Sequence, residues 1–325
     1  MNIPKHMMLT AMAGAFAAAL AMNVAAQSAP AAKPAATEAR HAATQSTFAT
    51  PEEASKALAD AVRAADVKAL LAVVGPSSKS WLFSGDKVAD ENDWKAFLAA
   101  YDTKNSLTKD GDSKATLSVG KDDWPFPAPI VKKGSTWSFD AESGKEEIIN
   151  RRVGRNELDT IQTLLAVVDA EREYAAGDMN GSGFPDYARQ FVSSPGKKDG
   201  LYWPQEEGKP ASPLGPLVAE ASSEGYKKGS AEKRASFHGY YYRIITAQGQ
   251  DAPGGAKEYM VGHRLMGGFA VIAWPATYGS SGVMTFVVNH DGVVYEKDLG
   301  AKTASIAEAT TRYNPGPSWR KAQQQ

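Results

Sequence analysis

The segment from residue 145 to residue 176 most constrains the fold, because it has the pattern of one unusually long helix. Its apolar residues recur at spacings of three, four, three and seven, on a stripe made of Leu158, Ile161, Leu165, Val168 and Ala175. Gly177 follows as a natural helix stop. Gly154 predicts a break or bend in the front part of the helix. We expect the stripe to pack on a sheet built from later strands.

Four later segments have the composition of strands, joined by loops rich in glycine and proline. They are residues 240–246, 269–274, 283–288 and 293–299. Asn289-His290-Asp291-Gly292 reads as the turn of a hairpin between the last two. This order predicts an antiparallel meander.

The region before the long helix predicts a smaller unit of helices followed by a curved hairpin sheet. Thr50-Pro51-Glu52-Glu53 is a helix start with Thr50 as N-cap and Glu53 able to close a capping box. A second helix is expected over residues 67–74, capped by Asp66, and a third after Asp90. A hairpin is expected over residues 130–139, with Trp137 and Phe139 facing inward. The chain is therefore predicted to be an α+β protein with one domain over residues 48–144 and a second over residues 145–320.

The first 26 residues predict export. A short basic start containing Lys5 precedes an uncharged, alanine-rich run, and Val24-Ala25-Ala26 offers small residues for signal peptidase before Gln27. Residues 27–47 are rich in Ala, Pro, Thr and Ser and read as a disordered tether. The chain has no cysteine, so an exported form must be stabilised by its core without disulfides. We expect a periplasmic or secreted protein.

Charge and hydropathy exclude two classes of partner. A formal net charge of −1 at pH 7 argues against a nucleic-acid surface, which needs a concentrated basic field. No apolar window long enough for a membrane span follows residue 26. An envelope protein or a glycan remains as the expected partner.

A possible calcium loop begins directly after the long helix. Oxygen-bearing residues stand at relative positions 1, 3, 5 and 9, with Gly181, Gly183 and Pro185 between them; they are Asp178, Asn180, Ser182 and Asp186. This spacing is typical of a calcium-binding loop, although position 12 is Arg189 where a bidentate Glu is usual. The alternative is a polar turn in which Asp178 or Asn180 caps the following backbone. Calcium is the only cofactor that the sequence suggests.

Three arginines near the start of the long helix form the second candidate site. Arg151, Arg152 and Arg155 fall within one and a half helical turns and could bind an anion or a carboxylate. The alternative is intramolecular pairing with nearby acids such as Glu146, Glu147 or Asp159.

Catalytic motifs are missing from the sequence. No HExxH pair, Gly-x-Ser-x-Gly elbow or phosphate-binding loop occurs. The sequence therefore favours a non-enzymatic binding or assembly module of the envelope. The alternative is a hydrolase acting on cell-wall or polysaccharide material, with carboxylates that sequence alone cannot pair.

Three resemblances add to this reading. Residues 126–188, "FPAPIVKKGSTWSFD" through "GSGFPDYA", together with "GLYWP" at residues 200–204, resemble exported bacterial proteins catalogued as domain of unknown function 2950. That resemblance implies bacterial export and a shared fold but no activity. "PEEASKALADAVRAADVKALLAVV" and "IVKKGSTWSFD" loosely resemble nuclear-transport-factor-2-like domains.

The third resemblance is to type IV pilins and pseudopilins. "LDTIQTLLAVVDAEREYAAGD" is similar to the second half of a pilin helix, and "GFAVIAWP" with "GVMTFVVNHDGVVYEKDLG" is similar to the closing strands. A pilin helix starts immediately after its leader peptide, whereas here more than a hundred residues intervene. Filament assembly is therefore in doubt even where the fold is shared.

Overall fold

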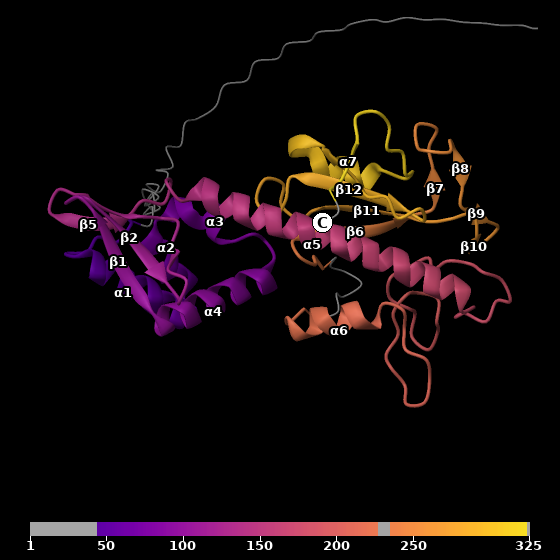
Figure 1. The fold of residues 1–325 in the computed structure, drawn as a ribbon, viewed down its shortest axis with the longest axis horizontal. Helices are drawn as coiled ribbons and strands as arrows, with labels where there is room; N and C mark the ends of the chain where they lie inside the picture. The colour runs from indigo at the N-terminus through magenta and orange to yellow at the C-terminus, as the bar shows by residue number, and fades with distance from the viewer. Residues whose placement is uncertain (1–43, 227–234, 324–325) are drawn as a thin grey trace, which may run out of the picture. The chain divides into compact units, whose positions relative to one another are not determined.

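The computed structural model describes residues 44–226 and 235–323, and these form an α+β fold as predicted (Figure 1). The predicted signal peptide and residues 27–43 of the predicted tether lie outside the described residues. Gln45, near the end of the predicted tether, is hydrogen-bonded to the folded region that follows. Its side-chain amide donates to the carbonyls of Val74 (2.9 Å) and Phe139 (2.8 Å).

The first helices begin at side-chain caps that the sequence displays. Helices α1 (Pro51–Arg63) and α2 (Val67–Val74) start at Thr50 and Asp66, whose side chains accept hydrogen bonds from the first turns. The 3-10 turn η1 (Pro76–Ser78) leads into the short helix α3 (Lys79–Leu82). Helix α4 (Lys87–Thr103) begins before Asp90, so the predicted start was wrong. Asp86 is the true cap and accepts from the backbone N–H groups of Val88 and Ala89.

The first sheet has the order β1-β2-β4-β5, with β3 paired to β2, and every pairing in it is antiparallel. Its strands are β1 (Asn105–Asp110), β2 (Lys114–Val119), β3 (Trp124–Pro125), β4 (Ile130–Lys133) and β5 (Thr136–Phe139). Trp137 and Phe139 are buried in the core that this sheet shares with α1, α2 and α4, as the hairpin pattern predicted.

Helix α5 (Lys145–Ala176) has the predicted bounds and runs without interruption through Gly154, where the sequence predicted a break or bend. Its buried apolar face differs from the predicted stripe. Leu164 and Val167 are buried with Ile161 and Val168, Leu165 is half-buried, and Leu158 is 45% exposed. The buried stripe is therefore rotated toward Leu164 relative to the predicted one.

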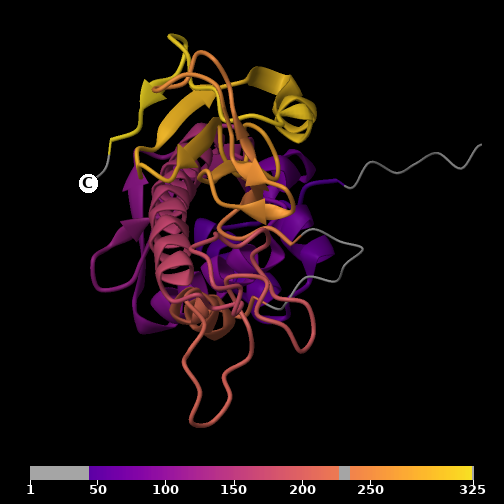
Figure 2. The ribbon, with the colours of Figure 1, turned by 90° about the vertical axis from the view of Figure 1, so that its right-hand side faces the viewer.

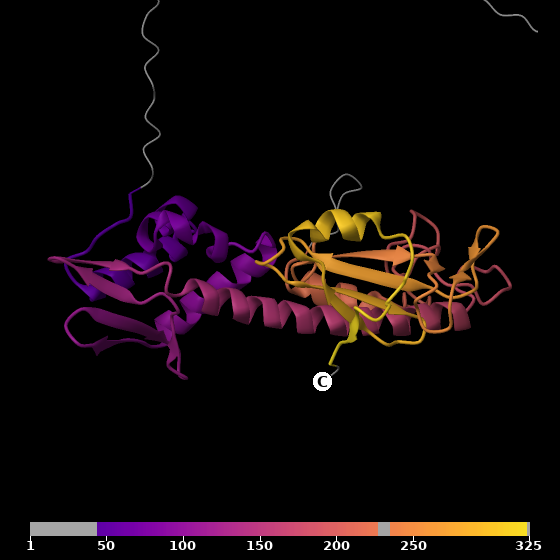
Figure 3. The same cartoon turned by 90° about the horizontal axis from the view of Figure 1, so that it is seen from above.

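The second sheet has the order β14-β13-β12-β11-β6 and its pairings are antiparallel. Its strands are β6 (Tyr240–Ile245), β11 (Ala270–Pro275), β12 (Met284–Asn289), β13 (Tyr295–Asp298) and β14 (Arg320–Lys321). Helix α5 packs on one face through β11 and β12, and α7 (Thr303–Ala309) packs on the other (Figure 3). The 3-10 turn η2 (Gly300–Lys302) precedes α7.

Smaller elements surround this sheet. Residues 178–214 form loops beside the C-terminal part of α5, as Figure 2 shows, and lead to α6 (Gly215–Ser223). Two short antiparallel pairs complete the unit: β7 (Ala247–Gln248) with β8 (Lys257–Glu258), and β9 (Met260–Val261) with β10 (Arg264–Leu265). Among the helices in the described ranges, none combines the length and apolar character that a membrane crossing requires.

The apolar residues form two clusters, and the first half of α5 makes hydrogen bonds to segments on both sides. One cluster lies among α1–α4 and the first sheet, and the other lies between α5 and the second sheet. Arg152 donates to the carbonyl of Trp81 (2.6 Å) on the first side, and Asn156 donates to the carbonyl of Ser281 (2.9 Å) on the second. Glu157 accepts from the backbone N–H groups of Val283 and Met284 (2.9 Å each).

Candidate functional site

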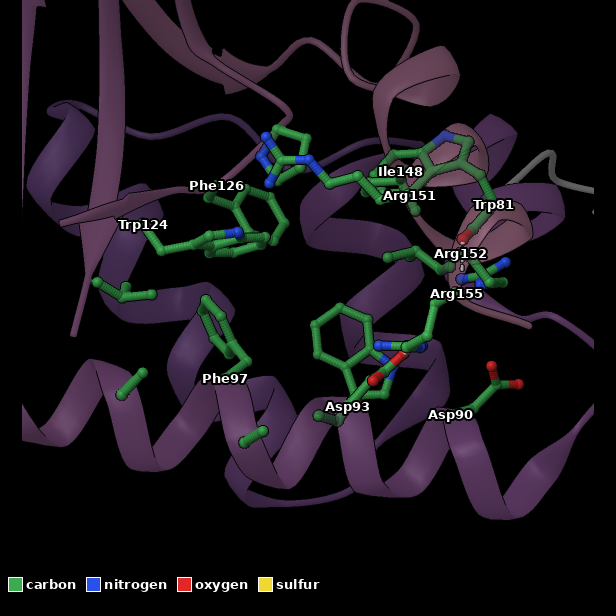
Figure 4. A pocket seen from close by; sticks show the side chains of 16 residues that line it. Trp81, Asp90, Asp93, Phe97, Trp124, Phe126, Ile148, Arg151, Arg152 and Arg155 are labelled. Carbon is green, nitrogen blue, oxygen red and sulfur yellow. Dashed lines mark hydrogen bonds and ion pairs between the residues drawn. The ribbon is translucent and has the colours of Figure 1, made fainter. Parts of the chain in front are cut away.

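A cavity of about 380 Å³ lies between α4, the first turns of α5 and the edge of the first sheet. This volume is within the range of small-molecule pockets in proteins. Its walls are mainly aromatic and aliphatic, and its charged residues are three arginines and two aspartates. Figure 4 shows Trp81, Arg152 and Arg155 grouped on one side of the cavity, with Trp124 and Phe126 on the other.

The aromatic walls come from segments far apart in the sequence. Trp81 belongs to α3, Trp94 and Phe97 to α4, Trp124 to β3, and Phe126 follows it. Edge-to-face and tilted contacts join Phe97 to Trp94 (ring centroids 5.9 Å apart) and to Phe126 (5.6 Å). Such contacts fix the orientation of the rings, so the apolar wall is preformed.

All three arginines of the predicted anion site line this cavity, but two of them are already paired with carboxylates. Arg155 is held by Asp93 (2.9 Å), and Arg151 by Glu147 (2.6 Å) while its guanidinium lies over the ring of Trp124. The contact of Arg151 with Glu147 is the pairing within the helix that the alternative describes, whereas the partner of Arg155 comes from α4. The side chains of Arg151 and Arg155 are about half exposed, so each pair contributes little to stability.

Arg152 has different surroundings. It is only 8% exposed, and Nη2 donates to the carbonyl of Trp81 (2.6 Å). Burial lowers the pKa of its guanidinium, and the negative charge of Asp90 opposes that effect. Nη1 is buried and has no hydrogen-bond partner within the described parts of the chain. A buried, charged donor without an acceptor is rare in folded proteins, and a bound water or ion is one way to satisfy it.

The two carboxylates of the cavity do not face each other as the catalytic pair of a glycoside hydrolase would. Asp90 and Asp93 are three residues apart on α4, and Asp93 is bound to Arg155. Asp90 accepts from the backbone N–H (3.0 Å) and the hydroxyl (2.8 Å) of Ser84. Burial raises the pKa of Asp90, although the hydrogen bonds from Ser84 and the charge of Arg152 counteract it. The arrangement suits binding better than acid–base catalysis across a cleft.

The predicted calcium ligands lie together in the loop after α5. Asp178 accepts from the backbone N–H groups of Ser182 (2.7 Å) and Gly183 (3.0 Å). Asp186, which is buried, accepts from the amide of Asn180 (3.0 Å) and the hydroxyl of Ser182 (3.1 Å). Arg189, at position 12 of the motif, donates instead to the carbonyl of His263 (3.1 Å).

These contacts leave both readings of the loop open. The carboxylate of Asp178 caps backbone N–H groups, as the polar-turn alternative expects. The Ser182 hydroxyl also lies 3.3 Å from Asp178 Oδ1 and 3.1 Å from Asp186 Oδ1, so oxygens of the kind that calcium prefers lie close together. Across the described residues, no three His, Asp or Glu side chains come together as a metal site.

A second polar cluster, which the sequence did not indicate, surrounds His238. Its Nδ1 lies 3.0 Å from Asp159 Oδ2, and its Nε2 lies 3.2 Å from Glu224 Oε2. The second contact has the distance of an ion pair but not the geometry of a hydrogen bond. Tyr226 stacks on the imidazole and donates to Asp86 Oδ2 (3.0 Å).

The charges around His238 favour its protonated form. Burial lowers the pKa of His238, but the hydrogen bond to Asp159 and the charges of Asp159, Glu224 and Asp86 outweigh burial and raise it. A neutral ring would point a lone pair at one of the two carboxylates. The cluster therefore joins α5, the end of α6 and the start of β6 as an ion-paired junction, with a carboxylate oxygen within ion-pair distance of each ring nitrogen.

The chain belongs to the family described as "Protein of unknown function (DUF2950)", which matches residues 45–322. The family resemblance read from the sequence is thereby confirmed. No curated protein and no solved structure matches the chain significantly. The resemblances to pilins and to nuclear-transport-factor-2-like domains remain predictions.

Proposed function

We propose that this family member is an exported, non-enzymatic binding module of the bacterial cell envelope, and that the cavity beside Arg152 is its ligand site. The observation that carries the proposal is the cavity itself, with preformed aromatic walls and a buried arginine at one side. Pockets that hold small molecules combine these two features, an apolar lining and a few placed polar groups.

The export part of the proposal rests on the first 26 residues. Their basic start, apolar run and Ala-x-Ala-like end are the features that the secretion machinery recognises. We expect the mature protein to begin near Gln27. N-terminal sequencing of protein from the periplasm or the medium tests this, and an intact Met1 on cytoplasmic protein would contradict it.

The binding part can be tested with a neutral apolar probe, N-phenyl-1-naphthylamine, whose emission rises in an apolar site. Ala96 lines the cavity from α4, so Ala96→Phe should fill part of the space. We expect this variant to weaken probe binding about tenfold, equivalent to about 1.4 kcal/mol. Ala99→Phe is the matched control, because Ala99 is exposed on the same helix and does not line the cavity.

Two outcomes of the probe experiment are decisive. Weaker binding in Ala96→Phe alone supports the cavity as the site. Absence of saturable probe binding to the wild type, or equal affinities in wild type and Ala96→Phe, would remove the basis of the proposal.

The proposal also includes the two resemblances of fold, to nuclear-transport-factor-2-like domains and to pilins. A helical layer on an antiparallel sheet, with a cavity at its edge, supports the nuclear-transport-factor-2-like reading of the first region. A long helix packed on an antiparallel meander supports the pilin-like reading of the second. The partner proposed for the module is an envelope protein or a glycan.

A further inference from the structure

The charged side chains at the cavity already have partners of opposite charge. Arg151 is ion-paired with Glu147 (2.6 Å), and Arg155 is ion-paired with Asp93 (2.9 Å). Both pairs are about half exposed, so each arginine is neutralised by a carboxylate in contact with it and not by solvent alone.

The third arginine, Arg152, is balanced in the same way but at longer range. It is buried, and Asp90 and Asp93 act on it with opposite charge. Together with Glu147, these two aspartates set three negative charges against the three positive charges of the arginines. Among the described residues at the cavity, no net charge is left over for a charged ligand to neutralise.

The rest of the lining is mainly aromatic, and part of it is open to solvent. Phe97 and Phe126 are buried in contact with each other, whereas Trp124 is 40% exposed. Trp124 and Phe126 lie across the cavity from Arg152, as Figure 4 shows. An apolar ligand in the cavity would remove aromatic surface from water, which is favourable.

We propose that the cavity binds a small, uncharged ligand with an apolar, ring-containing body, and that the ion pairs at the cavity disfavour charged ligands. This inference rests on the proposed function and names the ligand class of the same site.

The reason is the loss of hydration that an ion suffers on entering the cavity. Burying a charge is unfavourable unless a free partner of opposite charge replaces the water. A carboxylate would have to draw Arg151 or Arg155 away from its present partner, and an ammonium group would have to do the same to a carboxylate. A neutral ligand avoids this cost and keeps the gain from burying apolar surface.

The experiment is isothermal titration calorimetry of the full mature protein with two matched pairs of compounds that share one ring system. The first pair is 1-naphthaleneacetamide and 1-naphthaleneacetate, and the second is 1-naphthalenemethanol and 1-naphthalenemethylammonium. Within each pair the compounds differ in charge and hardly in shape. We expect each neutral compound to bind at least about tenfold more tightly than its charged counterpart, because only the ion must be desolvated without a free partner.

The role of the ion pairs can be tested by removing one carboxylate at a time. Asp93→Asn leaves Arg155 without its partner, so this variant should bind the acetate about threefold more tightly than the wild type and the acetamide equally well. Glu147→Gln, which frees Arg151, is a second variant with the same expected gain. Asp102→Asn is the matched control, because Asp102 lies on the same helix as Asp93 and is also paired with an arginine, but does not line the cavity.

Removing an arginine should have the opposite effect. Arg155→Gln leaves Asp93 without its partner, so the affinity for the methylammonium compound should rise about threefold while that for the methanol stays the same. Arg63→Gln is the matched control, because it unpairs Asp102 outside the cavity.

The possible failures can be told apart. If an ion binds the wild type as tightly as its neutral counterpart, or if neither neutral compound binds, the assignment of an uncharged ligand is overturned, and the binding function stands as long as the naphthylamine probe binds. Unchanged affinity for the acetate in both Asp93→Asn and Glu147→Gln would overturn the role of the ion pairs. No binding of the four compounds or of the probe would overturn both proposals.

Discussion

Glu171 is a carboxylic acid enclosed in the second apolar cluster. The side chain of Glu171 is fully buried; Oε2 accepts from the backbone N–H of Ala188 (2.8 Å), and Oε1 has no partner among the described residues. Burial raises the pKa of Glu171 to about 8, against 4.5 for an ordinary glutamate. The group is therefore protonated in the native protein at neutral pH and ionised in the unfolded chain.

This difference predicts how stability changes with pH. Between pH 4.5 and about 8 the native state holds a proton that the unfolded state has lost. The contribution of Glu171 to the free energy of unfolding should therefore fall with rising pH, by up to about 1.4 kcal/mol per pH unit. Glu171→Gln should remove this slope and be more stable than the wild type at pH 8. Urea unfolding at several pH values tests it, with the exposed Glu173→Gln as control.

His238 gives a dependence of the same sign for a different reason, because its native surroundings favour the charged form. Its raised pKa means that the native state binds a proton more tightly than the unfolded chain, whose histidine titrates near 6.5. The stabilisation is complete below pH 6.5 and is lost as pH rises through the higher native pKa. His238 has φ +50°, which asparagine tolerates well. His238→Asn should therefore keep the backbone and lose the part of the pH dependence that His238 contributes, while the part from Glu171 remains.

Melting temperatures from pH 6 to pH 9 measure the effect of His238. The exposed His263 gives a matched control, since His263→Asn should follow the wild type. A His238→Asn curve that parallels the wild type over this range would show that the ion-paired junction is not the titrating group.

At the scale of elements, α5 shows what the sequence could and could not predict. Its bounds follow from local signals, the apolar period and Gly177, so they were predictable. The buried face also contains Thr160, Thr163 and Glu171. Polar residues on a core face break the hydrophobic period, which is why the predicted stripe included exposed Leu158 and omitted Leu164.

The corrected face gives a direct test by substitution. Leu164 is fully buried, and burying a leucine contributes roughly 1.5–3 kcal/mol. Leu164→Asp removes that contribution and places a charge in the core, so it should abolish the cooperative melting transition. Leu158→Asp is the matched control on the same helix and should melt close to the wild type. Circular dichroism melting distinguishes the two, and an intact Leu164→Asp transition would show that the face is misassigned.

The loop after α5 gives the calcium prediction. If Asp178, Asn180, Ser182 and Asp186 bind the ion, the melting temperature should rise with added calcium and fall with a chelator, since a ligand of the native state stabilises it. Asp178→Ala should remove the response. Asp199→Ala is a matched control, because Asp199 also caps a loop, at Ser194 N (2.8 Å). A wild type whose melting is unaffected by calcium would favour the polar turn.

The sequence predicted only those parts of the candidate site whose residues are close together along the chain. The arginine cluster is local, within one and a half turns of α5, so the sequence revealed it. The aromatic walls are contributed by α3, α4 and β3, and no spacing rule relates Trp81 to Trp124. His238 meets Asp159 and Glu224 through tertiary packing, which a search for histidine pairs does not detect.

At the scale of the whole described unit, Asp86 joins elements from both apolar clusters. Its Oδ1 caps α4, and its Oδ2 accepts from Tyr226 and from the backbone N–H of Gly239 (3.0 Å each). Asp66 is a cap of the same kind at α2 but has no such second role in the described chain. A substitution of Asp66 therefore removes a helix cap alone. A substitution of Asp86 removes a helix cap and also the hydrogen bonds that join the two clusters.

Calorimetry can measure this coupling. We expect the wild type to unfold in one transition. Asp86→Ala should separate or broaden it, so that the van't Hoff enthalpy falls below the calorimetric enthalpy. Asp66→Ala should lower the midpoint by the loss of one cap, about 1 kcal/mol, and keep a single transition. A single sharp transition in Asp86→Ala would mean that the clusters are coupled mainly by other contacts.

The uninterrupted course of α5 also limits how the length of this chain can vary. Each inserted residue advances an α-helix by about 1.5 Å and turns it by about 100°. One extra residue between Arg152 and Glu171 would leave the cavity in place and rotate the whole downstream face away from the second sheet. Only an insertion near two full turns, about seven residues, would restore the phase, and it would still shift the contacts by roughly 10 Å along the axis. Insertions and deletions are therefore compatible with the fold in the loops that flank α5, but not inside α5 itself.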